Sequence, residues 1–185
     1  MAQARTPDMV KLLCGAITSC PALFVEAEKS LAEAFGPIDA TSEVFAFDFT
    51  HYYDEQMGSP LHRKFVSFAR LAGPDCLAEA KVRTNAIEAD FTGRLTKTCD
   101  VERPINLDVG YIAPGKLVLA SMKDFSHRIY LSQGVYAEVT LQFRGGRWNP
   151  LAWTFPDYAS GRYDAFLTEV RSRLREARRA ETGPC

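Results

Sequence analysis

The sequence contains no uninterrupted apolar stretch of the ~20 residues that a membrane-spanning helix needs. Its N-terminal segment also lacks an apolar run of signal-peptide character. The formal net charge of the 185 residues is only −1, so the strong basic bias of nucleic-acid-binding proteins is missing. We therefore predict a cytoplasmic protein without a membrane partner, for which nucleic acid is not the expected ligand.

Cysteine and histidine are scarce, and neither is arranged as a zinc site. The five cysteines are widely spaced, form no Cys-x-x-Cys pair and have no histidines at zinc-like spacing. An odd number of scattered cysteines fits a reducing compartment. The sequence thus predicts no metal site built from cysteine and histidine. Magnesium stays possible as a cofactor, because carboxylates such as those of Asp48, Asp108 and Asp157 can bind it.

Common catalytic motifs are missing as well. The stretch PGKLVLAS has Leu117 after its lysine and lacks the spacing of a phosphate-binding loop. No nucleophile elbow surrounds Ser121 or Ser126, and no cysteine-enzyme signature surrounds Cys76. An RNA-recognition signature is also absent. No motif of these classes therefore assigns a reaction to the chain.

The composition is that of an ordinary globular domain. Hydrophobic residues make up 46% of the sequence and charged residues 24%. A chain of this length buries about 70% of its unfolded surface, which is enough for a core without disulfides. We predict one domain, 1–185, with its core in 9–178.

The first 111 residues alternate between strand-like and helix-like patterns. Phe24, Ala27 and Leu31 recur at helical spacing, and Gly36-Pro37 ends that helix. The β-α-β-β-α-β order that results is the ferredoxin-like arrangement, in which two helices cover one face of an antiparallel sheet. The predicted elements are strand 9–19, helix 21–35, strands 42–49 and 64–71, helix 73–91 and strand 105–111.

An extension follows this core, so the predicted fold class is α+β with a ferredoxin-like sheet that is enlarged at its C-terminal end. We predict a loop over 92–103, a short helix over 114–125, two hairpins and a closing helix over 163–180. The second hairpin turns at Gly145-Gly146, which pairs Phe143 with Trp148.

The first hairpin, RIYLSQGVYAEV, admits two registers. A two-residue loop at Gln133-Gly134 mixes apolar and charged side chains on one face. A three-residue loop over 132–134 sets Ile129 against Ala137 and keeps apolar side chains together. Because register follows the hydrophobic pattern, we predict the three-residue loop.

The predicted register also sets Arg128 opposite Glu138. A guanidinium that is held by a carboxylate is an oriented fork for a phosphate or carboxylate ligand. The alternative is a cross-strand ion pair that contributes ~0.2–1 kcal/mol to stability. Both interpretations stay open from the sequence.

Two further polar groups have the same ambiguity. Lys116 and Lys123 are seven residues apart and would share one face of the helix predicted over 114–125, with His127 and Arg128 just beyond. They form either an anion site or a solvated helix face. Lys81, Asn85 and Glu88 form a polar stripe on the second helix, which is either hydrated or turned towards a site.

Aromatic residues concentrate in two stretches. In FAFDFTHYYDEQMG (45–58), the phenylalanines alternate as a core face, whereas Asp48, Tyr52 and Tyr53 are candidates for a site. In NPLAWTFPDY (149–158), the rings form either a plug before the last helix or a stacking wall for a ligand.

The chain resembles the prokaryotic family called domain of unknown function 4416 in several motifs that occur in the same order: FDFTHYYDEQMG, RTNAIE, NLDVGYI, KLVLASMKDFSHRIYLSQGVYAEVTL and WTFPDY. The resemblance covers roughly residues 10 to 170 and implies no reaction. A packed core does not require polar groups at so many motif positions, so the resemblance favours a pocket. The matching residues are Asp48, Thr50, Tyr52, Tyr53, Met57, Gly58, Thr84, Asn85, Glu88, Asn106, Asp108, Gly110, Tyr111, Lys116, Lys123, His127, Arg128, Tyr130, Glu138, Trp153, Pro156, Asp157 and Tyr158.

We predict that the polar face of the sheet binds a small anionic ligand, phosphorylated or nucleotide-like, and leave open whether the site is catalytic. The alternative is a non-catalytic assembly module that uses an exposed aromatic patch. The catalytic candidates are Asp48, Asp108, His127 and Glu138. The ligand-binding candidates are Tyr52, Tyr53, Asn85, Asn106, Lys116, Lys123, Arg128, Tyr130, Trp153 and Asp157.

Overall fold

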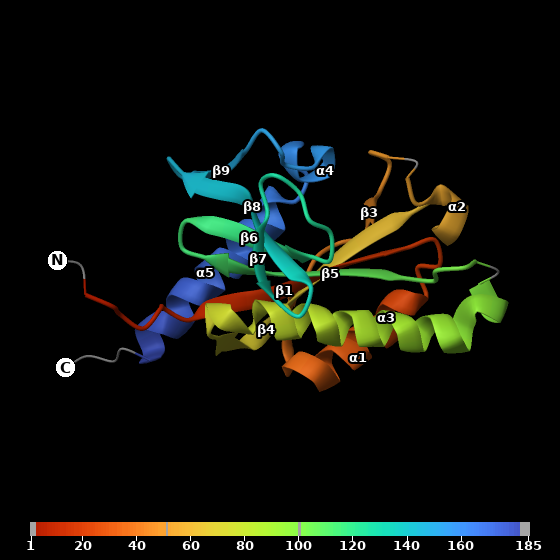
Figure 1. Cartoon of the computed structure of the whole chain (residues 1–185), viewed down its shortest axis with the longest axis horizontal. Helices are drawn as coiled ribbons and strands as arrows, with labels where there is room; N and C mark the ends of the chain where they lie inside the picture. The colour runs from red at the N-terminus through yellow and green to blue at the C-terminus, as the bar shows by residue number, and fades with distance from the viewer. Residues whose placement is uncertain (1–2, 51, 100, 182–185) are drawn as a thin grey trace.

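The computed structural model describes residues 3–50, 52–99 and 101–181. These residues form a nine-stranded antiparallel sheet with helices on both of its faces (Figure 1). Within these ranges, no helix is both long and apolar enough to cross a membrane.

The strands and helices follow one another in the order in which they are numbered in Figure 1. The strands are β1 (Val10–Thr18), β2 (Ile38–Thr41), β3 (Phe45–Ala46), β4 (His62–Ala72), β5 (Asn106–Ala113), β6 (Lys116–Ser121), β7 (Ile129–Ser132), β8 (Val135–Arg144) and β9 (Arg147–Pro150). The helices are α1 (Leu23–Phe35), α2 (Asp54–Met57), the 3-10 helix η1 (Pro74–Cys76), α3 (Leu77–Cys99), α4 (Pro156–Ala159) and α5 (Asp164–Glu181).

The sheet has the strand order β2-β4-β1-β5-β6-β8-β7, while β3 pairs with β4 and β9 pairs with β8. β1 lies between β4 and β5, and all nine of its residues are buried. Even Lys11 is covered, because its ammonium group donates to Asp39 at 2.6 Å and to the carbonyl of Phe68 at 2.8 Å. The apolar run at 9–19 therefore predicted a central strand correctly.

One face of the sheet is covered by α1 and α3, which lie side by side below it in Figure 1. The helices meet alternate residues of the central strands, as the period of two requires. We call it the α1/α3 face. Its core contains Leu12 and Cys14 of β1, Leu107 and Val109 of β5, and Phe91 of α3.

The opposite face is covered in part by α5, so we call it the α5 face. The helix buries Phe166, Val170 and Leu174, as its predicted stripe requires, against Leu13 and Phe65. The prediction that helices cover only one face of the sheet is therefore wrong, because the closing helix needs an apolar surface for its own stripe. The candidate residues Asn106, Asp108 and Glu138 lie on this face where β5, β6 and β8 extend past the core packed against α5.

The predicted helix over 114–125 is wrong. Lys116–Ser121 forms strand β6 between β5 and β8, followed by an irregular loop to Arg128. The segment KLVLAS has no apolar residues at helical spacing that a helix could bury on one side. As a strand, its backbone can form hydrogen bonds with both neighbouring strands, β5 and β8. The predicted loop over 92–103 is also wrong in its first half, because α3 continues to Cys99.

The second predicted strand, 42–49, is divided into β2 and β3, which both pair with β4. The alternation of its phenylalanines is nevertheless confirmed. Phe47 is buried and Phe45 is half-buried, whereas Val44, Ala46 and Asp48 are exposed. Periodicity thus predicted the inward side correctly, although the strand boundaries differ.

The first hairpin combines features of both registers. Ile129 pairs with Ala137 and Tyr130 with Tyr136, as predicted. The loop itself has two residues, Gln133 and Gly134, which both have positive φ, and the register shifts between Tyr130 and Ser132. The irregularity at Leu131 therefore keeps the apolar pairing, so the prediction of a three-residue loop is wrong. The second hairpin is confirmed, with Phe143 opposite Trp148 across Gly145-Gly146.

Gly110 is required where β5 and β6 approach closely. A Cβ at this position would lie 2.6 Å from Leu119 Cδ2 and would also overlap the carbonyl oxygen of Val118. We expect Gly110→Ala to lower the free energy of unfolding by about 1–3 kcal/mol, because the backbone of β6 must move. Gly93→Ala is the control: nothing lies within 4 Å of a Cβ in that exposed part of α3.

The control substitution replaces a helical glycine by alanine and should raise stability by about 0.5–1 kcal/mol. Urea denaturation of both variants measures the difference. Equal effects of the two substitutions would contradict the close approach at Gly110.

Candidate functional site

The strands β5 and β6 separate at one end of the sheet. Their pairing ends at Gly110 and Leu119, while β6 continues along β8 as far as Ser121. The free edge of β5 is closed by α3 instead. Lys81 donates to the carbonyl of Leu107 at 2.8 Å, and Glu88 accepts from the amide of Leu107 at 2.8 Å. The polar stripe on this helix therefore satisfies a buried strand edge, which is a structural role.

A cluster of polar side chains lies beside this divergence, on the α5 face. We call it the outer cluster: Ser121, Lys123, His127, Arg128 and Glu138. Glu138 lies opposite Leu119 and is only 3% exposed. Its Oε2 accepts from Arg128 Nε at 2.8 Å and lies 3.1 Å from His127 Nε2. The predicted contact between Arg128 and Glu138 is therefore present, and it is a buried one.

Arg128 is held in a single orientation. Besides Glu138, its Nη1 donates to Ser121 Oγ and to the carbonyl of Lys123, both at 2.9 Å. No hydrogen bond involves its Nη2 within the described ranges. A guanidinium with three fixed bonds and one open nitrogen is pre-oriented towards an external acceptor.

Aromatic rings flank the histidine of the outer cluster. The imidazole of His127 stacks on Trp153 with an interplanar angle of 9° and a centroid distance of 5.2 Å, and Phe125 lies 5.2 Å away on a tilted plane. Trp153 is anchored, because its indole donates to the carbonyl of Val139 at 2.9 Å. The tryptophan is 40% exposed and Phe125 is 64% exposed, so both rings have open surface for a ligand.

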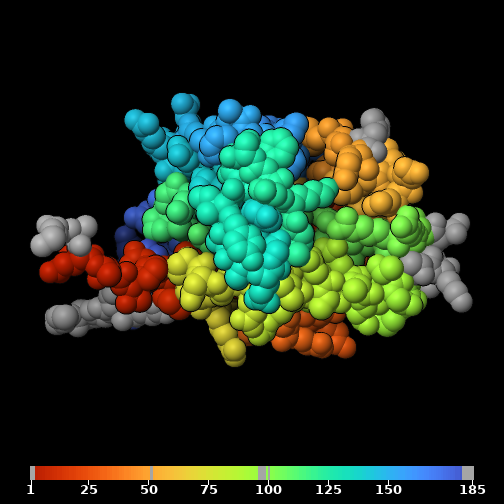
Figure 2. Space-filling model, in the orientation of Figure 1, coloured from red at the N-terminus to blue at the C-terminus, as the bar shows by residue number. Residues whose placement is uncertain are grey.

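Lys123 connects the outer cluster to the chain around α2. Its ammonium group donates to Tyr52 Oη at 3.0 Å, and this bond, with the positive charge, lowers the pKa of Tyr52. Tyr52 and Tyr53 contact each other edge to face. Figure 2 shows the loop after β6 and the β7–β8 hairpin at the front of the molecule, below α4 and beside the chain around α2.

Asn106 and Asp108 lie on the same face of β5, two residues apart, and with Tyr53 we call them the inner cluster. Asn106 Oδ1 accepts from Arg103, whose Nη2 also donates to Glu88 at 2.6 Å. Burial raises the pKa of Tyr53, and the nearby Asp108 carboxylate raises it further. The inner cluster therefore sits at the end of β5 where α3 closes the strand edge.

Beside the inner cluster lies a buried arginine that the sequence did not single out. Arg63 of β4 is 3% exposed and binds Asp157 directly and Asp108 Oδ2 at 2.7 Å. Burial raises the pKa of the adjacent Tyr163 to about 12. Four rings surround the guanidinium, with centroids 5.0–5.8 Å from Cζ: Phe47, Phe65, Tyr158 and Tyr163. Asp157 therefore joins α4 to the sheet rather than lining an open surface.

Several predicted site residues lie elsewhere. Lys116 is at the opposite end of β6 from Ser121, about 16 Å away at the usual rise per residue. It therefore does not lie beside Lys123, as the predicted helix required. Asp48 is exposed and pairs with Arg162, whose hydrogen bond lowers the pKa of the carboxyl group. Tyr130 is exposed on the edge strand β7, and Asn85 lies on α3, half-buried and without a hydrogen bond among the described residues.

Sequence reasoning missed two residues that organise this region, Arg63 and Arg103. Each lies outside the motifs that guided the prediction, in LHRKF and DVERP. No local signal singled out Arg63, because it stands between two other basic residues, His62 and Lys64, at the start of the strand predicted over 64–71.

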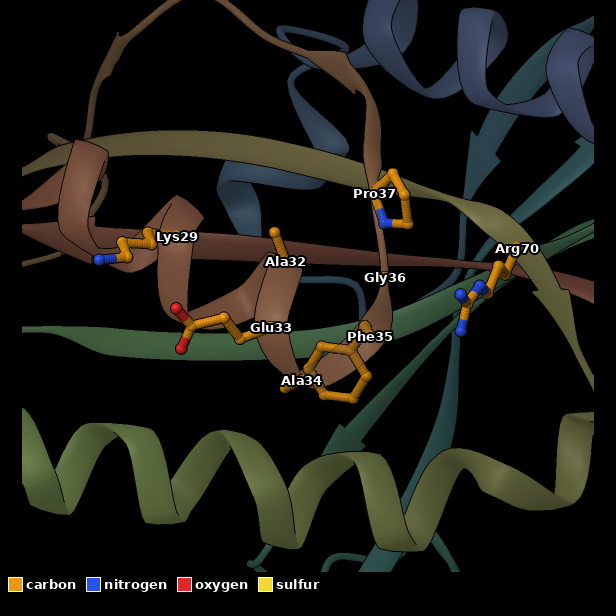
Figure 3. Close-up of a pocket in the computed structure, with 8 residues that line it drawn as sticks. All are labelled: Lys29, Ala32, Glu33, Ala34, Phe35, Gly36, Pro37 and Arg70. Atoms are coloured by element: carbon orange, nitrogen blue, oxygen red, sulfur yellow. The ribbon is translucent and has the colours of Figure 1, made fainter.

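Two other features bear on ligands. A shallow surface depression at the C-terminal end of α1 is lined by Lys29, Glu33 and Arg70, with Phe35 between them (Figure 3). It contains none of the predicted site residues. No group of three histidine, cysteine, aspartate or glutamate side chains suitable for a metal ion occurs in the ranges that the structure describes.

The comparisons with known proteins give one match. No curated protein and no solved structure matches the chain. The model of one family matches residues 8–174, which is most of the sequence and includes both clusters. The chain therefore belongs to the family described as domain of unknown function DUF4416.

Proposed function

We propose that the protein binds a small phosphorylated or nucleotide-like anion at the outer cluster. The observation that carries this proposal is the orientation of Arg128, which three acceptors fix while Nη2 stays open. Lys123 and His127 lie beside it, and the Lys123 ammonium group supplies further N–H donors. Fixed donors of this kind suit phosphate oxygens, which accept several hydrogen bonds from different directions.

The rings beside the cluster suit a ligand that carries a planar group. Trp153 and Phe125 expose large surfaces next to His127, and Trp153 cannot rotate freely because Val139 holds its indole. Stacking on such rings contributes to the binding of nucleobases. The proposal therefore includes nucleotides as well as smaller phosphates.

His127 is the residue that would move a proton if the bound ligand reacts. Its imidazole lies 3.1 Å from a buried carboxylate, Glu138, which can fix the tautomer and orientation of the ring. Binding does not require this step, so the proposed function is ligand binding, with His127 and Glu138 as the acid–base pair of any reaction there.

We also infer that β1, α1, β2, β4, α3 and β5 form a ferredoxin-like unit. The strand order β2-β4-β1-β5, together with two helices on one face, supports this assignment. β6 to β9 then extend the unit past its β5 edge and carry the outer cluster.

A second candidate function, an assembly module, has one observation in its favour. All four residues of the edge strand β7 are exposed, with Ile129 at 71% and Tyr130 at 58%. Exposed apolar side chains on an unpaired edge are typical of contact surfaces.

Thermal unfolding with inorganic phosphate, pyrophosphate, sugar phosphates and nucleotides tests the proposed function. At about 100 times the dissociation constant, a ligand stabilises by about 2.7 kcal/mol, which corresponds to roughly 5–10 °C for a domain of this size. We expect such a shift in the wild type and its loss in Arg128→Ala. Arg147→Ala, which changes an exposed arginine of the β8–β9 hairpin, is the control and should keep the shift.

Two results would contradict the proposal: no compound shifts the wild type, or Arg128→Ala retains the shift. If, in addition, the mass in solution rises with concentration and Ile129→Ser abolishes that rise, the assembly module is the better assignment.

A further inference from the structure

Three polar atoms on the α5 face are buried without a hydrogen-bond partner among the described residues. They are the Asn106 amide nitrogen, the Nε of Arg63 and the hydroxyl group of Tyr158. Their residues are only 2–4% exposed. Buried polar groups are almost always satisfied, so such a group indicates a bound water or a ligand. Asn106 is the one that lies in the inner cluster, next to Asp108.

The unpaired amide nitrogen of Asn106 has a fixed direction. Its Oδ1 accepts from Arg103, and Arg103 is held in turn by Glu88 at 2.6 Å and by a backbone bond to Gln56 at 2.9 Å. Because the carbonyl end of the side chain is occupied, the amide end must point to the other side. The side chain therefore offers a donor in one direction only.

Asp108 offers an acceptor beside that donor. Its Oδ2 is taken by Arg63 at 2.7 Å, whereas Oδ1 has no hydrogen bond in the described part of the chain. The side chain is 27% exposed, so the free oxygen is accessible. Residues two apart on a strand project from the same face, so this acceptor and the Asn106 donor can meet one ligand.

The inner cluster lies within reach of the outer cluster. Gly110 pairs with Leu119, which pairs with Glu138, so Asp108 and Glu138 are separated by two strand spacings and two residues. Because β5 and β6 diverge beyond Gly110, the Cα atoms of Asp108 and Glu138 are at least about 12 Å apart. The hydrogen bond between Lys123 and Tyr52 joins the two sides of this gap at 3.0 Å. A ligand with a phosphate at one end and polar groups at the other can bridge it.

We infer that Asn106 and Asp108 bind sugar hydroxyl groups, so that the ligand of the outer cluster is a sugar phosphate or the sugar phosphate part of a nucleotide. This inference rests on the proposed function. A hydroxyl group donates and accepts at once, and vicinal hydroxyls therefore satisfy both the Asp108 oxygen and the Asn106 amide. A second carboxylate or phosphate would meet the charge of Asp108 and be repelled.

Calorimetric titration with methyl phosphate, ribose 5-phosphate and 2-deoxyribose 5-phosphate tests the inference. In the wild type, we expect ribose 5-phosphate to bind about tenfold more tightly than methyl phosphate, the effect of one or two well-placed hydrogen bonds. The deoxy sugar should lose part of that preference. Asn106→Ala and the isosteric Asp108→Asn should each bring the ratio close to one.

Gln142→Ala is the control, because this exposed amide side chain lies on the part of β8 that pairs with β9 and should keep the tenfold ratio. Asp108→Asn provides the test if Asn106→Ala does not fold. Equal binding of methyl phosphate and ribose 5-phosphate by the wild type would overturn the inference. An ordered water would then satisfy the Asn106 amide. The proposed function would not be affected by this result. Absence of binding by any phosphate would overturn the proposed function itself.

Discussion

Asp157→Ala should lower the free energy of unfolding by about 3 kcal/mol. The substitution removes one of the two carboxylates that neutralise Arg63, and breaking a buried ion pair typically costs about 3–5 kcal/mol. Asp108 still binds the guanidinium at 2.7 Å, which is why we expect the lower end of that range. For a domain of this size, the melting temperature should fall by roughly 6–12 °C.

Asp48→Ala is the control for this variant, since it removes an aspartate that pairs with Arg162 on the surface. An exposed pair contributes about 0.2–1 kcal/mol, so the control should unfold nearly as the wild type does. Chemical denaturation at constant pH gives both values. A loss below 1 kcal/mol for Asp157→Ala would mean that Asp108 and the aromatic rings around Arg63 compensate its charge without Asp157.

Glu88→Ala should have the next largest effect, a loss of about 2–4 kcal/mol. The Glu88 carboxylate accepts a hydrogen bond from the backbone amide of Leu107, a residue that is fully buried. It also accepts a hydrogen bond from Arg103. An unsatisfied buried amide costs about 1–3 kcal/mol, and a hydrogen bond to a charged group contributes about 1.5–3 kcal/mol. The two effects overlap, because water can enter the space that the glutamate side chain leaves and satisfy part of the freed groups.

The matched control is Asp90→Ala, which removes an exposed acid from the same helix, where it pairs with Arg94. Its loss should stay within about 1 kcal/mol. Hydrogen exchange at Leu107 provides a second measurement: the amide should exchange faster in Glu88→Ala and at the wild-type rate in Asp90→Ala. Unchanged exchange in Glu88→Ala would show that the edge of β5 is protected by something other than α3.

Local patterns were sufficient for several elements along the chain. The apolar run of β1, the stripes of α1 and α5 and the Gly145-Gly146 turn each carry their own signal within about ten residues. Such signals depend on side-chain periodicity and turn chemistry, which require no knowledge of the partner. The family resemblance likewise followed from motif order, and the family model confirms it across residues 8–174.

The segment that became β6 lacked a decisive local signal. KLVLAS is short and apolar, and periodicity alone does not separate a strand from a buried helix turn of this length. Its conformation depends on two neighbours, β5 and β8, whose edges it joins. The predicted site is wrong at Lys116 for this reason, because the helix predicted over 114–125 placed it beside Lys123, whereas Lys116 begins a strand.

The contacts of the candidate site also fall into two kinds, those that a local pattern predicts and those between residues far apart in the sequence. The contact between Arg128 and Glu138 followed from a hairpin register, which is local, and the structure contains it. The hydrogen bond between Lys123 and Tyr52 joins residues 71 positions apart, and the contacts of Arg63 with Asp108 and Asp157 span 45 and 94 positions. No spacing along the sequence encodes such distances.

The sequence by itself determined which residues of β1, α1 and α5 face inward, where the second hairpin turns and which family the chain belongs to. Only the tertiary structure decided that α5 covers half of the second face, that α3 closes the edge of β5 and that polar residues gather where β5 and β6 separate. The physical reason is that inward and outward positions are set by the backbone period of each segment, whereas a buried charge or strand edge is stabilised only by the partner that folding brings to it.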